Sequence, residues 1–147
     1  RRMFMEKLEY AIEKAKNIFK IIAVIFIDLD KFKAVNDSYG HNIGDKLLAA
    51  AGLRLINCVK SGDMVARFGG DEFIMMLEDL DTKDTAYKIM KRISDSLNKP
   101  FIIDGYEIHL SASIGISFYP YDGEDAETLL IKSDNQMYSD KGIQISI

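Results

Sequence analysis

The chain has 147 residues, of which 48% are hydrophobic and 29% charged, and its net charge is −4. These values favour one globular domain, argue against a disordered or fibrous chain, and leave no broad basic surface for duplex nucleic acid. The longest apolar run is too short for a bilayer-spanning helix, no signal-like N-terminus is present, and the single cysteine excludes a disulfide framework, so we expect a soluble, cytoplasmic domain.

The chain opens with a predicted helix followed by a predicted strand. Met3 to Phe19 places apolar residues at helical spacing, with a buried face made of Leu8, Ile12, Ala15 and Phe19. Ile21 to Ile27 is a continuous β-branched and aromatic run, which is typical of a central strand buried on both faces. The run ends at Asp28-Leu29-Asp30, so carboxylates are expected at the end of a strand.

Two helices and a hairpin are predicted next. Lys31 to Tyr39 suits a short helix closed by Gly40, and Asn42 to Val59 suits a longer one. Met64 to Phe68 and Phe73 to Leu77 are short apolar runs joined through two glycines. Because glycine readily takes positive φ, this pair predicts a tight hairpin.

The remaining elements follow the same kind of pattern. Thr82 to Leu97 predicts a helix that Pro100 stops, and Phe101 to Ile103 and Glu107 to Phe118 predict two strands. A final helix is expected from about Asp125 to Lys141. We therefore predict a single domain over residues 1–147, of α/β class and α+β type, with a mixed, mostly antiparallel sheet of about five strands flanked by helices.

Carboxylates stand at two points of this predicted sheet. Asp28 ends the first strand, and Asp71-Glu72 follow the glycine pair at the hairpin tip. If the hairpin and the first strand are neighbours, these groups meet at one edge, repel one another and call for a cation. Oxygen ligands favour Mg²⁺. On the Gly-Gly-Asp-Glu stretch alone, however, a solvated hairpin tip is the better interpretation, since glycine and aspartate are common turn residues.

Longer motifs change that balance. The segment from Asp28 to Asp45 (DLDKFKAVNDSYGHNIGD), the stretch RFGGDEF from Arg67 to Phe73, and SIGIS from Ser113 to Ser117 together resemble the GGDEF domain of bacterial diguanylate cyclases. The resemblance runs from Arg1 to about Gly142. It implies a palm-like nucleotide cyclase fold with a βααββαβ core. It also implies that two subunits, each holding one GTP, together make the second messenger cyclic di-GMP and release pyrophosphate.

The resemblance implies a metal and catalytic set. Asp28 and Asp71 match metal-ligand positions, Leu29 supplies a backbone carbonyl, and Glu72 assists metal binding or activates the attacking hydroxyl. Which carboxylate acts as the base stays open. Arg67 matches an arginine that steadies the signature loop and the phosphates. The implied metal is Mg²⁺, with Mn²⁺ as an alternative.

The resemblance also implies a GTP-binding set, which consists of Phe32, Lys33, Asn36, His41, Asp45, Gly69, Gly70 and Lys141. Asn36 and Asp45 match positions that read the guanine edge, through an amide that donates and accepts and a carboxylate that accepts. Lys33 and Lys141 match phosphate-binding positions, although without the motif either lysine reads as an exposed helix side chain. His41 belongs to the turn before Asp45 and is expected to hold that loop.

Two departures from the family pattern stand out. Many members carry a phosphate-binding arginine four residues after the position of Lys141, where this chain has Ile145. The family's inhibitory site uses an Arg-x-x-Asp motif, which Lys60 and Asp63 match only in part. Lysine lacks the planar fork of arginine, so we expect a weak or absent inhibitory site.

Three functions are compatible with these observations. The first is a Mg²⁺-dependent diguanylate cyclase domain that works as a homodimer, under the control of a sensor or effector domain in a longer protein. The second is a non-catalytic module that binds GTP and regulates a neighbouring domain. The third is a structural or interaction domain with solvated carboxylates. In none of them does this segment contact nucleic acid or a membrane.

Overall fold

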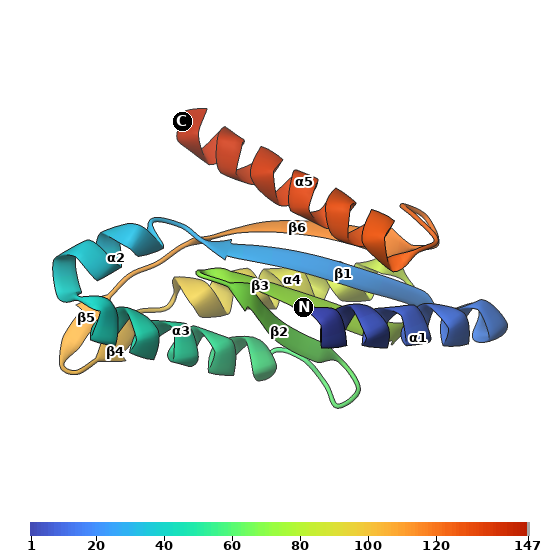
Figure 1. Cartoon of the computed structure of the whole chain (residues 1–147), viewed down its shortest axis with the longest axis horizontal. Helices are drawn as coiled ribbons and strands as arrows, with labels where there is room; N and C mark the ends of the chain where they lie inside the picture. The colour runs from blue at the N-terminus through green and yellow to red at the C-terminus, as the bar shows by residue number, and fades with distance from the viewer. Residues whose placement is uncertain (147) are drawn as a thin grey trace.

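The computed structural model describes the backbone of residues 1–146 and the side chains of residues 1–140, so the side chains of Lys141 and Ile145 lie outside the described residues. The elements, drawn in Figure 1, are α1 (Arg2–Ile18), β1 (Ile21–Leu29), α2 (Phe32–Tyr39), α3 (His41–Ile56), β2 (Met64–Gly69), β3 (Glu72–Leu80), α4 (Lys83–Asn98), β4 (Phe101–Ile103), β5 (Tyr106–Ile108), β6 (Ala112–Tyr119) and α5 (Ala126–Ser146). None of the helices in this described part is long and apolar enough to cross a bilayer.

The main sheet has four strands in the order β2-β3-β1-β6, and each neighbouring pair is antiparallel. The predicted α+β architecture with a central, mostly antiparallel sheet is therefore confirmed. The strand count differs from the expected five because β4 and β5 pair only with each other, in a separate two-stranded sheet. No parallel pair occurs between the strands of the described chain.

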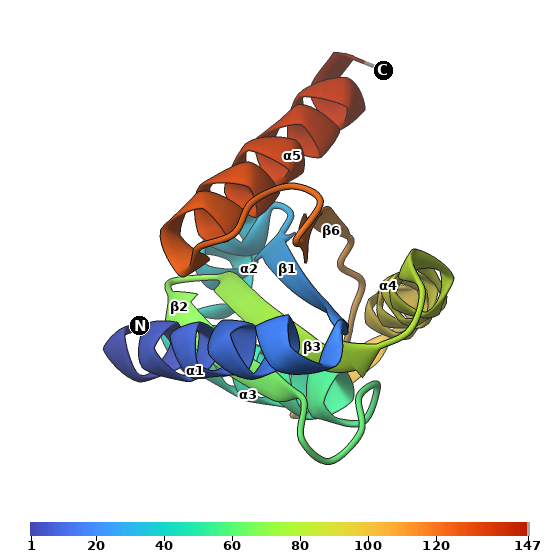
Figure 2. The ribbon, with the colours of Figure 1, turned by 90° about the vertical axis from the view of Figure 1, so that its right-hand side faces the viewer.

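The first strand is an interior strand, between β3 and β6, and every one of its residues is buried. Ala23, Ile25 and Ile27 pack into the core shared with α2, α3 and α4, whereas Val24 and Phe26 pack into the core shared with α1 and α5. Figure 2 shows one helix of each set, α4 and α5, on opposite sides of β1. The continuous apolar run is thus explained, since alternate side chains of a strand point to opposite faces.

The predicted buried face of the first helix is right except at its end. Leu8, Ile12 and Ala15 are buried, but Phe19 is 94% exposed, so its assignment to the core is wrong. Phe19 follows the last turn of α1 in the left-handed conformation, with φ of 56°. A residue in this conformation ends a helix and turns its side chain away from the helical stripe.

The predicted strand from Glu107 to Phe118 is also wrong as one element, because it is interrupted between β5 and β6. β5 pairs with β4, whereas β6 pairs with β1, so the chain must leave one sheet before it joins the other. The Ser111 carbonyl accepts a hydrogen bond from the Asp30 N–H at 2.9 Å where β6 begins to follow β1. This bond fixes the crossing next to the end of β1.

The last helix crosses β6 closely. A Cβ atom added at Gly115 would overlap the Ser133 carbonyl and the Met137 backbone nitrogen, so the glycine is what allows α5 this close to the sheet. Asp125 caps the helix, because its carboxylate accepts hydrogen bonds from the Thr128 N–H at 2.8 Å and the Thr128 hydroxyl at 3.0 Å. The helix that carries Lys141 is therefore fixed at its start and along its first turns.

Candidate active site

The end of β1 brings the predicted carboxylates together. Asp28 lies directly opposite Glu72 in the β1–β3 pair, and the Leu29 N–H donates to the Asp71 carbonyl at 3.1 Å. Because the N–H and C=O of a strand residue lie along the same edge, the Leu29 carbonyl also faces the hairpin. The expectation that the first strand and the hairpin are neighbours, with their acidic residues at one edge, is confirmed.

Asp28 and Glu72 also share a face of the sheet. Residues directly opposite in an antiparallel pair point the same way, with Cβ atoms about 4.5–5.5 Å apart. Asp28 is 6% exposed and Glu72 is half-buried, on the face that α1 and α5 cover. Asp71, also half-buried, precedes this pair at the hairpin tip. Two negative charges held this close and partly out of water favour a cation between them.

A further carboxylate lies near this group that the sequence did not single out. Burial raises the pKa of Asp134 on α5, the Arg1 guanidinium lowers it, and the negative charge of Asp28 raises it again. Ser133, the residue before Asp134, lies against Gly115, which pairs with Phe26 two residues before Asp28, so α5 brings a further acidic side chain toward the end of β1. Asp134 lies in the final helix outside the three motifs, and a lone aspartate in a helix usually faces solvent. The sequence therefore offers no reason to single it out.

The acidic group fits Mg²⁺ only together with other ligands. Within residues 1–140, no three His, Cys, Asp or Glu side chains gather closely enough to hold a metal ion alone. Mg²⁺ commonly binds through one or two carboxylates and completes its octahedral shell with waters and substrate phosphates. The carboxylates of Asp28 and Asp71 and the Leu29 carbonyl are oxygen donors of the right kind for such a partial site.

The hairpin tip is open and fixed in shape. Gly69 and Gly70 have φ of 147° and 50°, as expected for a tight turn, and a Cβ atom at either would meet nothing within 4 Å. The Arg67 side chain donates from Nε to the Gly70 carbonyl at 2.9 Å. The glycines therefore serve the backbone conformation, and the space beside them is open.

The residues expected to read a base lie where α2 meets α3. Asn36 belongs to α2, whereas Asp45 is exposed in the first turns of α3, one residue after the buried Gly44. The Asn36 side-chain oxygen Oδ1 is buried and accepts no hydrogen bond from any described residue. An unsatisfied buried acceptor costs about 1–3 kcal/mol, so a ligand N–H that reached it would recover that free energy.

The other expected GTP-binding residues differ in exposure. Phe32 is buried at the start of α2, whereas Lys33 and His41 are exposed on α2 and at the start of α3. The Lys33 side chain is thus accessible from solvent, whereas the Phe32 side chain packs into the core. The remaining phosphate-binding candidate, Lys141, lies outside the described side chains.

The partial inhibitory motif is held in a turn. The Asp63 carboxylate accepts hydrogen bonds from the backbone N–H groups of Lys60 at 3.3 Å and Glu78 at 3.1 Å. Burial raises the pKa of Asp63, against the effect of these two hydrogen bonds. The Lys60 residue is exposed. Two backbone N–H groups thus hold the Asp63 carboxylate in place, whereas the Lys60 side chain is exposed to solvent.

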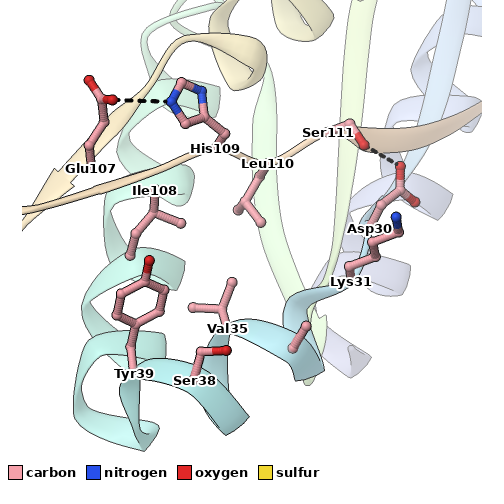
Figure 3. A pocket seen from close by; sticks show the side chains of 11 residues that line it. Asp30, Lys31, Val35, Ser38, Tyr39, Glu107, Ile108, His109, Leu110 and Ser111 are labelled. Atoms are coloured by element: carbon pink, nitrogen blue, oxygen red, sulfur yellow. Dashed lines mark hydrogen bonds and ion pairs between the residues drawn. The ribbon is translucent and has the colours of Figure 1, made fainter.

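A pocket of about 440 Å³ lies on another side of α2, between this helix and the segment from Glu107 to Ser111. Figure 3 shows Val35 and Tyr39 of α2 across from Ile108, and Ser111 directed at Asp30. The Asp30 carboxylate accepts hydrogen bonds from the Ser111 and Ser113 hydroxyls at 2.9 and 2.7 Å. Neither the carboxylates at the hairpin nor Asn36 lines this pocket, so it is separate from the candidate active site.

His109 and Glu107 form a pair at the rim of this pocket. The His109 nitrogen Nε2 lies 3.3 Å from a Glu107 carboxylate oxygen, and both side chains are exposed (Figure 3). Pairs of this kind at the surface contribute little to stability. The sequence assigned no role to His109, and its partner in the structure is a neighbouring surface residue.

Comparisons with known proteins agree with this geometry. A family model described as "Diguanylate cyclase, GGDEF domain" matches residues 1–144. The bifunctional diguanylate cyclase/cyclic di-GMP phosphodiesterase MucR of Pseudomonas aeruginosa is 43% identical, over 96% of this chain and 20% of MucR. The cyclic di-GMP phosphodiesterase NbdA of the same organism is 38% identical, over 96% of this chain and 18% of NbdA. The chain thus spans about a fifth of the length of these relatives.

A solved structure matches over most of its own length. The GGDEF domain of TpbB, also called YfiN, from Pseudomonas aeruginosa has a TM-score of 0.91 and 36% sequence identity. The match covers 94% of this chain and 86% of that one. The fold that brings Asp28, Asp71 and Glu72 together is therefore one known from a crystal structure.

Proposed function

This chain belongs to the GGDEF diguanylate cyclase domain family, and we propose that it is an active cyclase domain that condenses two GTP molecules into cyclic di-GMP and two pyrophosphates. The observation that carries the proposal is the position of Asp28 opposite Glu72, next to Asp71 and the glycine turn. We propose further that residues 1–147 are one domain of a longer protein, in which a sensor or effector domain controls it.

The residues of the chain supply the metal-binding end of the site. Asp28, Asp71 and the Leu29 carbonyl would hold Mg²⁺, or Mn²⁺ in its place, with Glu72 beside them. When bound, the metal would neutralise phosphate charge and polarise the α-phosphate. The Arg67 guanidinium holds the loop through the Gly70 carbonyl and keeps further N–H groups for a phosphate oxygen.

The other end of the site recognises and orients the nucleotide. Asn36 and Asp45 would bind the guanine edge, where the carboxylate accepts from base N–H groups and the carboxamide supplies the complementary contacts. Lys33 and Lys141 would bind phosphates, and His41 would hold the turn between α2 and α3. Fixing the base and the phosphates together aims the ribose 3′-hydroxyl, and such positioning accounts for a large part of catalysis in reactions of this kind.

The reaction needs two domains. In each of two condensations, a 3′-hydroxyl gives its proton to a base and its oxygen bonds to the α-phosphorus of the opposite GTP. The bond from that phosphorus to the oxygen bridging to the β-phosphate breaks, and pyrophosphate leaves with that oxygen. A single domain that binds one GTP cannot complete this exchange. We therefore propose a homodimer whose two sites face each other, and association sets the rate at low protein concentration.

A product assay by mass spectrometry tests this function. The purified domain, and a version dimerised by a fused coiled coil, are incubated with GTP and Mg²⁺. We expect cyclic di-GMP and pyrophosphate from both, with a faster rate from the dimerised form. The absence of both products from the dimerised form at high protein concentration would contradict the proposal.

A second candidate is a GTP-binding module that regulates a neighbouring domain without catalysis. Two observations favour it: NbdA, a relative named as a phosphodiesterase, contains a similar segment, and Ile145 replaces the family's phosphate-binding arginine. Calorimetry distinguishes the two functions. Tight GTP binding with no turnover in the dimerised form supports the module, whereas turnover supports the cyclase.

A further inference from the structure

We propose that Gly44 is a positioning residue for guanine recognition, because its lack of a side chain sets where the Asn36 carboxamide lies. This inference rests on the proposed function, in which Asn36 reads the base. It assigns a role to a residue that touches neither the nucleotide nor the metal in that function. Gly44 acts through Asn36 across the contact between α2 and α3.

The contact between the two residues is very close. A Cβ atom added at Gly44 would overlap the Asn36 side-chain oxygen Oδ1, and would lie 3.0 Å from Asn36 Cγ and 3.3 Å from Phe32 Cζ. The Asn36 carboxamide therefore occupies the volume that any other residue at position 44 would fill. The backbone of α3 and the side chain of Asn36 are in direct contact.

The backbone conformation gives no other reason for glycine here. Gly44 lies inside α3, and its N–H donates to the Gly40 carbonyl at 3.1 Å. It is not among the glycines of positive φ, a group that includes Gly40, Gly69 and Gly70. Glycine inside a helix is less favourable than alanine, so the close approach of Asn36 is the feature that explains it.

In the position that Gly44 allows, the Asn36 side-chain oxygen Oδ1 packs against α3, is buried, and accepts no hydrogen bond from any described residue. Asp45 follows Gly44 directly, on the same helix. Because Gly44 lets Asn36 pack directly against α3, it sets the position of Asn36 relative to Asp45, the other residue expected to bind the base.

An alanine at position 44 should move Asn36 rather than unfold the domain. Phe32 is buried and cannot easily shift, whereas the carboxamide is the end of a rotatable side chain. The same helix offers a matched control in Gly52, where an added Cβ atom would meet only Phe73 Cε1, at an ordinary 3.6 Å. Gly44→Ala and Gly52→Ala thus make the same chemical change with and without the contact to Asn36.

The experiment compares Gly44→Ala, Gly52→Ala, Asn36→Ala and the double variant Asn36→Ala/Gly44→Ala with the unaltered domain. Calorimetry with non-hydrolysable GTP and ATP analogues and Mg²⁺ measures the preference for guanine. The side-chain NH₂ signals of Asn36 in a ¹⁵N NMR spectrum report the carboxamide position without any nucleotide. Thermal melting reports folding.

We expect Gly44→Ala to move the Asn36 signals and to reduce the guanine preference about as much as Asn36→Ala, roughly 10-fold or more. The double variant should be no worse than either single variant, since both changes remove one interaction. Gly52→Ala should keep the signals and the preference. If Gly44→Ala is unfolded, the double variant should regain the fold, because the clash is then relieved.

Three results would overturn the inference: unmoved Asn36 signals in Gly44→Ala, a guanine preference that Gly44→Ala keeps while Asn36→Ala loses it, or additive losses in the double variant. Failure of the double variant to refold an unfolded Gly44→Ala would do the same. If Asn36→Ala itself leaves GTP binding unchanged, the base-reading role of Asn36 fails, and the inference fails with it. That outcome is distinguishable, because it appears in the variant that leaves Gly44 intact.

Discussion

Asp28 lies directly opposite Glu72 across the β1–β3 pair, and the residue after Asp28 donates its backbone N–H to the residue before Glu72. This pairing converts two separate acidic stretches of the chain into one group at the edge of the sheet. It explains why glycines precede the carboxylates, since a tight turn must place them level with the end of β1. The proposed metal site and the proposed chemistry depend on this register.

The first prediction concerns Asp28→Asn. The substitution keeps the size of the side chain and removes its charge, so the fold is retained while the metal loses a ligand. We expect cyclic di-GMP formation from GTP and Mg²⁺ to fall by about 100-fold or more. Asp84→Asn, in the exposed first turn of α4, is the control and should keep full activity. An active, folded Asp28→Asn domain would show that Asp28 is not a ligand.

Asp45→Ser should relax the choice of base. A serine hydroxyl cannot accept from two guanine N–H groups as a carboxylate can, so the penalty for adenine falls. We expect the ratio of kcat/KM for GTP to that for ATP to decrease by about 10-fold or more. Asp37→Ser, on the exposed surface of α2, serves as the control. An unchanged ratio in Asp45→Ser would remove Asp45 from the base-reading pair.

Asp30→Ala should destabilise the domain. The Asp30 carboxylate is 9% exposed and accepts hydrogen bonds from Ser111 and the fully buried Ser113. Its loss removes the acceptor of the buried Ser113 hydroxyl and the side-chain bond to Ser111, while the backbone bond from Asp30 to Ser111 is kept. We expect the free energy of unfolding in urea to fall by about 2–4 kcal/mol. Ser111→Ala, which removes only the exposed donor, should cost less, and equal losses would contradict this account of the network.

Asp125 should make the stability of α5 depend on pH. Hydrogen bonds from the Thr128 backbone N–H and hydroxyl hold the pKa of Asp125 below its ordinary value. A carboxyl with a lowered folded pKa stabilises the fold above its unfolded pKa, and this contribution is lost as the pH falls through the folded value. Asp125→Ala should therefore lower the Tm at pH 7 by about 2–4 °C.

The same variant should approach the unaltered domain in acid. The difference in Tm is expected to narrow as the pH falls below about 4, where the Asp125 carboxyl of the unfolded chain begins to take up a proton, and to vanish below the lower pKa of the folded state. Melting curves from pH 7 to pH 3 measure this, with Asp125→Asn as a control that keeps a capping acceptor without the charge. A difference that stays constant across this range would exclude the charge-assisted cap.

Lys60→Arg should strengthen product inhibition. Asp63 is already held by the backbone N–H groups of Lys60 and Glu78, so the missing part of the inhibitory motif is the planar guanidinium. We expect weak inhibition of the unaltered domain by cyclic di-GMP and an inhibition constant about 10-fold lower in Lys60→Arg. Lys7→Arg, on the exposed surface of α1, is the control. Equal inhibition of all three proteins would show that residue 60 does not bind the product.

Local patterns predicted much of this fold. The unbroken apolar run from Ile21 to Ile27 indicated a strand buried on both faces, and the glycine pair indicated the hairpin, because each pattern depends on neighbouring residues alone. The prediction that Asp28 lies beside the hairpin needed one assumption, that the first strand and the hairpin are neighbours in the sheet. The pairing of β1 with β3 confirms it.

Features that depend on distant contacts were not predictable in this way. The break between β5 and β6 arises because β5 pairs with β4 whereas β6 pairs with the distant β1. Next to it, Asp30 bonds two serines at sequence separations of 81 and 83. The need for glycine at position 44 comes from the Asn36 side chain on another helix. Neither feature changes the hydrophobic periodicity of the sequence, so each becomes visible only in the packed structure.

The central claim is that Asp28 and Asp71 bind one cation with the substrate phosphates, and anomalous diffraction from Mn²⁺ tests it most directly. Crystals of the domain are grown with Mn²⁺ and a non-hydrolysable GTP analogue, and data are collected at the manganese absorption edge. We predict an anomalous peak at coordination distance, roughly 2.0–2.3 Å, from carboxylate oxygens of both aspartates and from a phosphate oxygen. A peak bound by phosphates alone, or at a site away from both aspartates, would contradict the account.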